Sequence, residues 1–150
     1  MKRLLALAAL LTATSLAAVA QNGKITGKLT YPSDYIPTTM IVCVYAADGL
    51  PGDRYCSSDN ASNLRKAGFI FRVNHRAASY QVQLPAGSYY LYATFPKGKA
   101  PVADYEYYKA YYNEFVRCGM SVDCPSKRNI AVDVRAGRTT GGITLGDWYP

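Results

Sequence analysis

The chain has 150 residues, and its 17 Lys and Arg residues against 10 Asp and Glu residues give a formal net charge of +7. This length suits one domain with a hydrophobic core of useful size. The basic residues are scattered, so the charge predicts attraction to anionic surfaces in general and does not indicate a nucleic-acid-binding protein. After the first twenty residues, no segment is long and apolar enough for a transmembrane helix.

Residues 1–20 have the pattern of a secretory signal peptide. A basic start at residues 1–3 precedes an uncharged apolar stretch, and the small residues Ala18 and Ala20 stand immediately before Gln21. The apolar stretch is too short to cross a bilayer as a stable helix. We therefore expect export and cleavage before Gln21, which leaves 130 residues and, without the two basic residues of the leader, a net charge of +5.

The rest of the sequence is a series of short alternating runs separated by turns. These runs are residues 24–31, 39–46, 69–73, 80–84, 89–95, 130–135 and 142–145. Alternation of apolar and polar residues between turns rich in Gly, Pro, Asn and Asp is typical of antiparallel sheets. The pattern predicts an all-β fold, a seven-stranded antiparallel β-sandwich formed by one domain over residues 21–150.

Two segments do not follow this alternation. Residues 52–68 are polar and are predicted to form a loop tethered at Cys56. In residues 104–116 the spacing of Tyr105, Tyr108 and Tyr112 fits one face of a helix as well as a loop. For this segment we favour an irregular stretch that leads into a short strand at residues 111–116.

The four cysteines Cys43, Cys56, Cys118 and Cys124 all follow the leader. An even number of cysteines in an exported chain indicates disulfides, because the destination is oxidising. Proximity in sequence favours the pairs Cys43–Cys56 and Cys118–Cys124, although four cysteines allow three pairings. A zinc site is disfavoured, since neither spacing is C-x-x-C and His75 is the only histidine.

No group of residues in the sequence indicates catalysis. His75 has no identifiable Ser or Cys partner and is predicted to be a surface or turn histidine. Asp104, Glu106 and Asp123 are predicted to be solvated loop carboxylates. Asn60 begins an N-glycosylation acceptor pattern, which short sequences often contain by chance. We therefore expect a protein that is not an enzyme and that needs no cofactor and no metal.

Tyrosine is the most unusual feature of the composition, with 14 residues. The predicted binding surface is a cluster in which five tyrosines surround one lysine: Tyr105, Tyr107, Tyr108, Lys109, Tyr111 and Tyr112. Exposed tyrosines suit recognition because each offers a large contact area and a polar tip at low entropic cost. The alternative is that half of them pack inside the sandwich and the others cover its edge. Trp148 is expected to pack back on the sheet.

With these runs assigned, the chain resembles the carboxypeptidase regulatory-like modules of bacterial exported proteins, which have a transthyretin-like (prealbumin-like) seven-stranded sandwich. The resemblance depends on residues 23–30, on the turn and aromatic strand of residues 84–93, and on residues 134–139 before the last run. It covers most of residues 23–146. It implies a location in the cell envelope, most simply the periplasm, for this exported chain.

The chain differs from the common members of that family because the module stands alone. The loop of residues 118–125 and the tail of residues 147–150 have the character of a stand-alone exported subgroup. Because a fold of this kind does not establish function, two hypotheses stay open. One is a protein-binding or structural module of the envelope, and the other is a carbohydrate or cell-wall binder that uses exposed tyrosines. Neither the partner nor the oligomeric state follows from the sequence.

Overall fold

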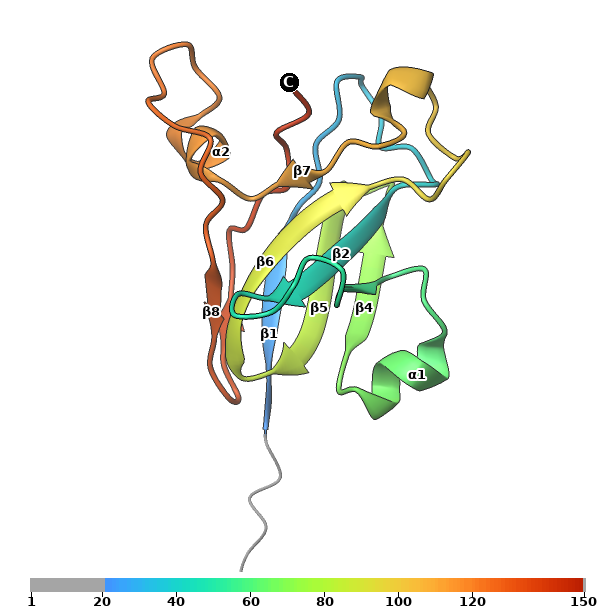
Figure 1. Ribbon diagram of the computed structural model, residues 1–150, viewed down its shortest axis with the longest axis vertical. Helices are drawn as coiled ribbons and strands as arrows, with labels where there is room; N and C mark the ends of the chain where they lie inside the picture. Colours follow the sequence, from blue (N-terminus) through green and yellow to red (C-terminus); the bar gives the residue numbers. More distant parts are fainter. Residues whose placement is uncertain (1–20, 150) are drawn as a thin grey trace, which may run out of the picture.

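A computed structural model describes residues 21–149 and shows a β-sandwich of two sheets (Figure 1). The predicted signal peptide lies outside the described residues. The strands are β1 (Asn22–Lys28), β2 (Ile41–Ala46), β3 (Tyr55–Cys56), β4 (Ile70–Asn74), β5 (Ser79–Pro85), β6 (Gly87–Thr94), β7 (Ala110–Tyr111), β8 (Val132–Val134) and β9 (Thr139–Thr140). The helices are α1 (Ala61–Lys66), the 3-10 helix η1 (Ala103–Tyr105) and α2 (Glu114–Cys118).

The first sheet has the strand order β4-β5-β1-β9, and the second has the order β3-β2-β6-β7. β8 also belongs to the second sheet, because it pairs with the beginning of β6 while β7 pairs with its end. The tight turn between β5 and β6 carries the chain from one sheet to the other (Figure 1). β6 is therefore the central strand of the second sheet, with β2 along its other edge.

The main core lies between the two sheets and follows the predicted alternation. On β5, Tyr80, Val82 and Leu84 are buried, and on β6 Tyr89, Leu91 and Ala93 belong to the same core cluster. Neighbouring residues on β5 are only half-buried, because successive side chains of a strand point to opposite faces. The alternation predicted for these two runs is therefore seen in the burial of β5 and in the core residues of β6.

The last predicted strand differs from the observed one. Residues 142–145 were expected to form an antiparallel strand, but the strand here is β9, and it runs parallel to β1. The backbone then continues beside β1 through hydrogen bonds such as Leu145 N to Lys28 O at 2.9 Å. Gly27 permits this approach, since a Cβ at that position would meet the carbonyl oxygen of Ile143. With the short β3 and β7, residues 21–149 contain nine strands where the pattern indicated seven.

Two local predictions were wrong because side-chain capping outweighed the strand and loop patterns. Residues 52–68 contain β3 and the helix α1, whose first turn is capped by the Asn60 side chain. The strand expected at residues 111–116 ends at Tyr111. The Asn113 side chain then accepts a hydrogen bond from the Val116 amide at 2.9 Å and begins α2 in its place.

Two disulfides have the pairing that sequence proximity favours, and the described residues contain no free cysteine. Cys43–Cys56 joins directly opposite residues of β2 and β3, whereas Cys118–Cys124 closes the loop after α2. Trp148 packs back as expected: it is buried, and its indole N–H donates to the Thr30 carbonyl at 2.6 Å. Among residues 21–149, no helix is long and apolar enough to cross a membrane.

Candidate functional site

The second sheet buries aromatic side chains on its outer face as well as on its inner face. On β6 the residues between the core positions, Tyr90 and Tyr92, point outward and contact Tyr45 of β2. Tyr111 of β7 packs on Tyr92 with a ring-centroid distance of 5.0 Å. Tyr45, Tyr92 and the disulfide Cys43–Cys56 form a second buried cluster, against which the half-buried Tyr90 and Tyr111 pack; we call these four tyrosines the outer tyrosine layer.

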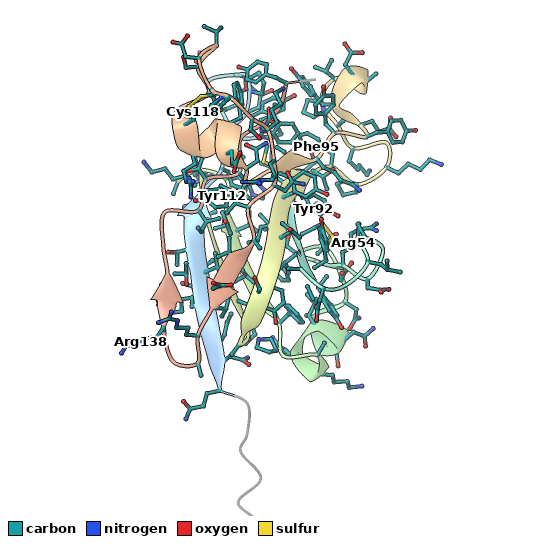
Figure 2. All side chains as sticks on the ribbon, turned by 60° about the vertical axis from the view of Figure 1, so that its left-hand side comes forward. Arg54, Tyr92, Phe95, Tyr112, Cys118 and Arg138 are labelled. Atoms are coloured by element: carbon teal, nitrogen blue, oxygen red, sulfur yellow. A yellow bond between two sulfur atoms is a disulfide. The ribbon has the colours of Figure 1, made fainter. Side chains whose placement is uncertain are left out.

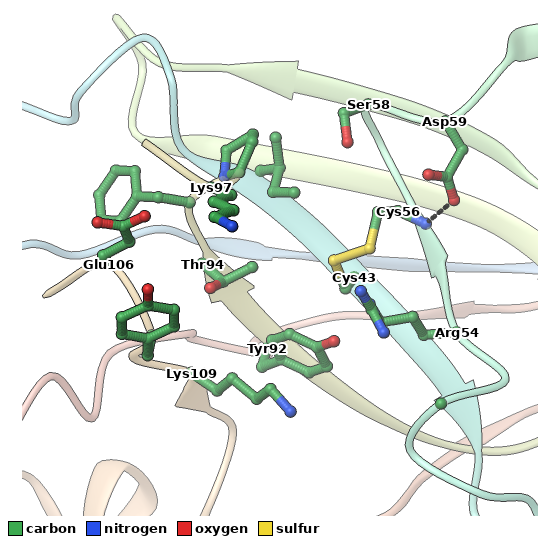
Figure 3. Close-up of a pocket in the computed structure, with 15 residues that line it drawn as sticks. Cys43, Arg54, Cys56, Ser58, Asp59, Tyr92, Thr94, Lys97, Glu106 and Lys109 are labelled. Atoms are coloured by element: carbon green, nitrogen blue, oxygen red, sulfur yellow. Dashed lines mark hydrogen bonds between the residues drawn. A yellow bond between two sulfur atoms is a disulfide. The ribbon is translucent and has the colours of Figure 1, made fainter. Parts of the chain in front are cut away.

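A groove of about 580 Å³ crosses one end of this outer face (Figure 3). Its floor consists of outward-facing residues of β2 and β6, namely Ile41, Cys43, Tyr92 and Thr94. One wall is the segment 52–59, which carries β3 and is attached to the floor by the disulfide. The other wall is the segment 96–109, which connects β6 to β7. We call this feature the outer groove.

Basic side chains stand on both walls of the outer groove. Arg54 belongs to the first wall, and Lys97 and Lys109 belong to the second; all three are exposed. None of them takes part in the two salt bridges found within residues 21–149. The groove therefore presents three positive charges that no carboxylate of the described chain pairs directly.

The two carboxylates of the groove are bound to backbone amides. Asp59 accepts a hydrogen bond from the Cys56 amide at 2.7 Å, and Glu106 accepts one from the Gly98 amide at 2.7 Å. Each bond fixes the geometry of one wall, because a charged acceptor binds an amide more strongly than a neutral one does. These carboxylates thus shape the two walls, and neither forms a salt bridge with a basic residue of the groove.

Tyr92 lies at the centre of the groove floor. Its side chain is 1% exposed, and Lys109 Nζ lies 5.4 Å from the centroid of its ring, within cation–π range. Burial raises the pKa of Tyr92, and the positive charge of Arg54 opposes part of that rise. The Tyr92 hydroxyl has no hydrogen-bond partner within residues 21–149. Figure 3 shows this hydroxyl directed toward the Arg54 side chain.

The structure divides the predicted tyrosine surface into three parts. Tyr105, Tyr108 and Tyr112 pack against the main core, as the alternative interpretation expected of half of the cluster. Tyr111 belongs to the outer tyrosine layer, where burial, followed by a hydrogen bond with Tyr45, raises its pKa. Only two residues of the six, Tyr107 and Lys109, line the outer groove. Tyr107 is 81% exposed, so its ring is available for contact.

Sequence reasoning missed the first wall of the groove. Arg54 stands two positions before Cys56, a spacing that places both side chains on one face of an extended chain, and this signal was available. Lys97 gave no such signal, because its position depends on the pairing of β6 with β2 and on the path of the connection that follows. In Figure 2, Arg54 and Tyr92 lie on the same side of the molecule, away from Arg138.

The other residues considered from the sequence lie elsewhere or have local roles. His75 occupies the turn between β4 and β5, where its Nε2 is 2.8 Å from the Met40 carbonyl oxygen. Asn60 caps α1, Asp104 is exposed on the 3-10 helix η1, and Asp123 is exposed in a loop. Within residues 21–149, no cluster of three or more His, Cys, Asp or Glu side chains could hold a metal ion.

No protein-family model matches the chain, and neither does any curated protein or any solved structure. The resemblance to carboxypeptidase regulatory-like modules therefore stays a prediction, while the two-sheet sandwich itself is observed. A functional assignment depends on the chemistry of the outer groove.

Proposed function

We propose that the chain is an exported, non-enzymatic protein-binding module of the cell envelope, and that it binds its partner in the outer groove. The observation that carries this proposal is the composition of the groove. An apolar and disulfide-braced floor lies between walls that present the exposed Tyr107 and three basic side chains. Tyr and Arg are the residues that most often dominate the binding energy of protein interfaces.

The shape of the groove favours a polypeptide over a sugar ring. Sugar binding by aromatic stacking needs the face of an exposed ring, but Tyr92 on the floor is 1% exposed and Lys109 lies over its ring. Tyr107 is the one tyrosine of the groove lining that is well exposed. A cleft between two loops with a rigid floor suits an extended segment or a projecting loop of a partner protein.

Export is proposed from the signal-like start of the sequence and fits the two disulfides, which persist in oxidising compartments. The transthyretin-like topology and the carboxypeptidase regulatory-like family are part of the same proposal. Expression of the full chain in a Gram-negative host tests export directly. We expect mature protein in the periplasmic fraction with Gln21 at its N-terminus, and retention of an uncleaved chain in the cytoplasm would contradict it.

The binding proposal is tested by affinity capture from envelope extract with the protein purified after such expression. Tyr107→Ala removes an exposed ring that packs on nothing in the core, so we expect the variant to fold normally and to lose the captured protein. Tyr35→Ala is the matched control, because Tyr35 is 64% exposed and lies outside the outer groove.

A partner retained equally by the wild type and by Tyr107→Ala would exclude the outer groove as its binding site. Co-sedimentation with purified cell-wall material in the absence of any captured protein would instead support the carbohydrate hypothesis. In that case the exposed Tyr107 ring beside Lys109 would be the first surface to test against glycans.

A further inference from the structure

The Tyr92 hydroxyl is an unsatisfied polar group in the floor of the outer groove. It is buried, and it has no hydrogen-bond partner within residues 21–149. A buried hydroxyl without a partner is costly and uncommon in native proteins, so its presence in a groove requires an explanation. A ligand atom that accepts a hydrogen bond from this hydroxyl would satisfy it.

The surroundings of the hydroxyl determine which acceptor fits. Arg54 lies on one side of Tyr92 and Lys109 lies on the other, with its ammonium group over the ring (Figure 3). A neutral carbonyl would satisfy the hydroxyl and leave both cations unpaired. A carboxylate satisfies the hydroxyl and both cations together, because it offers two oxygens with about four acceptor sites.

No carboxylate of the groove lining forms a salt bridge with Arg54, Lys97 or Lys109 among the described residues. The lining contains two acidic residues, Asp59 and Glu106, and each is hydrogen-bonded to a backbone amide of its own wall. Arg54 is exposed and forms no salt bridge within residues 21–149, so its long side chain can turn outward to admit a ligand. The Tyr92 hydroxyl and these cations are therefore free to bind a carboxylate of another molecule.

We propose that the outer groove holds an acidic segment of its protein partner, with one Asp or Glu carboxylate bound by the Tyr92 hydroxyl, Arg54 and Lys109. This inference rests on the proposed protein-binding function and specifies its ligand. Lys97, on the same wall as Lys109, faces neighbouring acidic residues of the segment. The site selects charge on the segment more than its exact sequence, since flexible cations of this kind pair with any nearby carboxylate.

The test measures binding of a fluorescein-labelled oligo-glutamate peptide by fluorescence anisotropy at low salt, with an oligo-glutamine peptide as the neutral probe. We expect oligo-glutamate alone to bind, and we expect salt to weaken the binding. Tyr92→Phe keeps the ring and removes the hydroxyl, so we expect about a tenfold loss of affinity, the usual order for one hydrogen bond to a charged group. Arg54→Gln should cause a loss of at least similar size.

Tyr31→Phe is the matched control for the hydroxyl. The Tyr31 hydroxyl is also buried without a partner, but it lies outside the outer groove, where its ring packs against Trp148. We expect Tyr31→Phe to bind oligo-glutamate as the wild type does. Equal affinity of Tyr92→Phe and the wild type for the acidic peptide would overturn the proposed carboxylate site.

Two other outcomes separate this inference from the proposed function. If a captured protein partner depends on Tyr107 while oligo-glutamate does not bind, the groove binds protein and the acidic-segment inference is wrong. If a polyuronate binds with the same dependence on Tyr92 and oligo-glutamate does not, the carboxylate comes from a glycan, and the assignment to an acidic polypeptide is overturned.

Discussion

The two faces of the β2–β6 pair are formed by the same strands but are covered in different ways. The inner face presents Val42, Val44 and Leu91, which are fully buried against the other sheet. The outer face presents Tyr92 and the disulfide of Cys43, which are covered by two connecting segments instead of a second sheet. The inner face is thus closed by regular structure, and the outer face is closed by loops that leave a groove.

Two buried tyrosine hydroxyls illustrate the contrast between the faces. On the first sheet's inward face, the Tyr80 hydroxyl is buried but donates to the Ile143 carbonyl at 2.9 Å. On the outer face of the second sheet, the Tyr92 hydroxyl is buried without a partner within the described residues. The Tyr80 hydroxyl is thus satisfied, as buried polar groups generally are, whereas the Tyr31 hydroxyl at the edge of the core is not. The outer face keeps one unsatisfied hydroxyl beside two cations, which is the property expected of a binding site.

The largest effect on stability is expected from truncating a side chain of the inner face. Leu91→Ala removes a fully buried side chain between the sheets and should lower the free energy of unfolding by about 4 kcal/mol, because it leaves a cavity as well as losing burial. Urea denaturation measures the change. Tyr107→Ala on the outer side should change stability by less than about 0.5 kcal/mol. Comparable losses for the two variants would contradict the division between the faces.

The disulfides should differ in their effect on the outer groove. Cys43→Ala with Cys56→Ala removes the link between the floor and one wall, and should cost about 3 kcal/mol and weaken ligand binding. Cys118→Ala with Cys124→Ala opens a shorter loop outside the groove, at a cost of about 2 kcal/mol. Thermal unfolding and peptide binding should be measured on both pairs. Unchanged binding by the first pair would show that this wall needs no covalent anchor.

Two matched tyrosine variants compare a buried hydroxyl that has a hydrogen-bond partner with one that has none. Tyr80→Phe leaves the Ile143 carbonyl without its donor and should lower stability by about 1.5 kcal/mol. Tyr92→Phe removes a hydroxyl that has no partner to lose, so stability should be unchanged or rise by up to about 1 kcal/mol. The two changes in unfolding free energy should therefore differ in size and can differ in sign. Equal losses would mean that the Tyr92 hydroxyl is already satisfied.

The smallest expected effect comes from tyrosine ionisation, which changes stability only at alkaline pH. Burial raises the pKa of Tyr80 and of Tyr111 above the ordinary value of 10.0. At a pH between 10.0 and the raised pKa, each of these tyrosines has lost its phenolic proton in the unfolded chain but keeps it in the folded chain. The contribution of these two tyrosines to stability is therefore constant below about pH 10 and falls as the pH rises further. A pH titration of tyrosinate absorbance should show a group of tyrosines that ionises above pH 10 in the folded protein and near pH 10 in denaturant. If all fourteen tyrosines of the folded protein ionised near pH 10, this prediction would be wrong.

Periodicity determined a large part of this fold. The alternation in residues 80–84 and 89–95 indicated two strands, and in β5 it coincides with the alternation of burial, because a strand places successive side chains on opposite sides. Proximity of the cysteines indicated the observed disulfides, and the apolar area of Trp148 indicated its burial. Each of these features follows from local chemistry, so no knowledge of the strand order was needed.

Where the sequence was ambiguous, capping and long-range pairing decided the structure. Asn113 begins α2 where a strand was expected, and β9 pairs in parallel with β1 across more than one hundred positions of the sequence. The predicted tyrosine surface contained Tyr107 and Lys109 of the outer groove but also three half-buried tyrosines that pack against the main core.

The sequence by itself indicated the β-rich class and the alternation of its regular strands, and it favoured the cysteine pairing that the structure shows. The tertiary structure alone brought Arg54, Tyr92 and Lys109 together, from three segments separated in the chain. Their meeting depends on which strands lie beside β6 and on the paths of two connecting segments. No residue pattern within one segment encodes those relations, because they arise from pairing between distant strands.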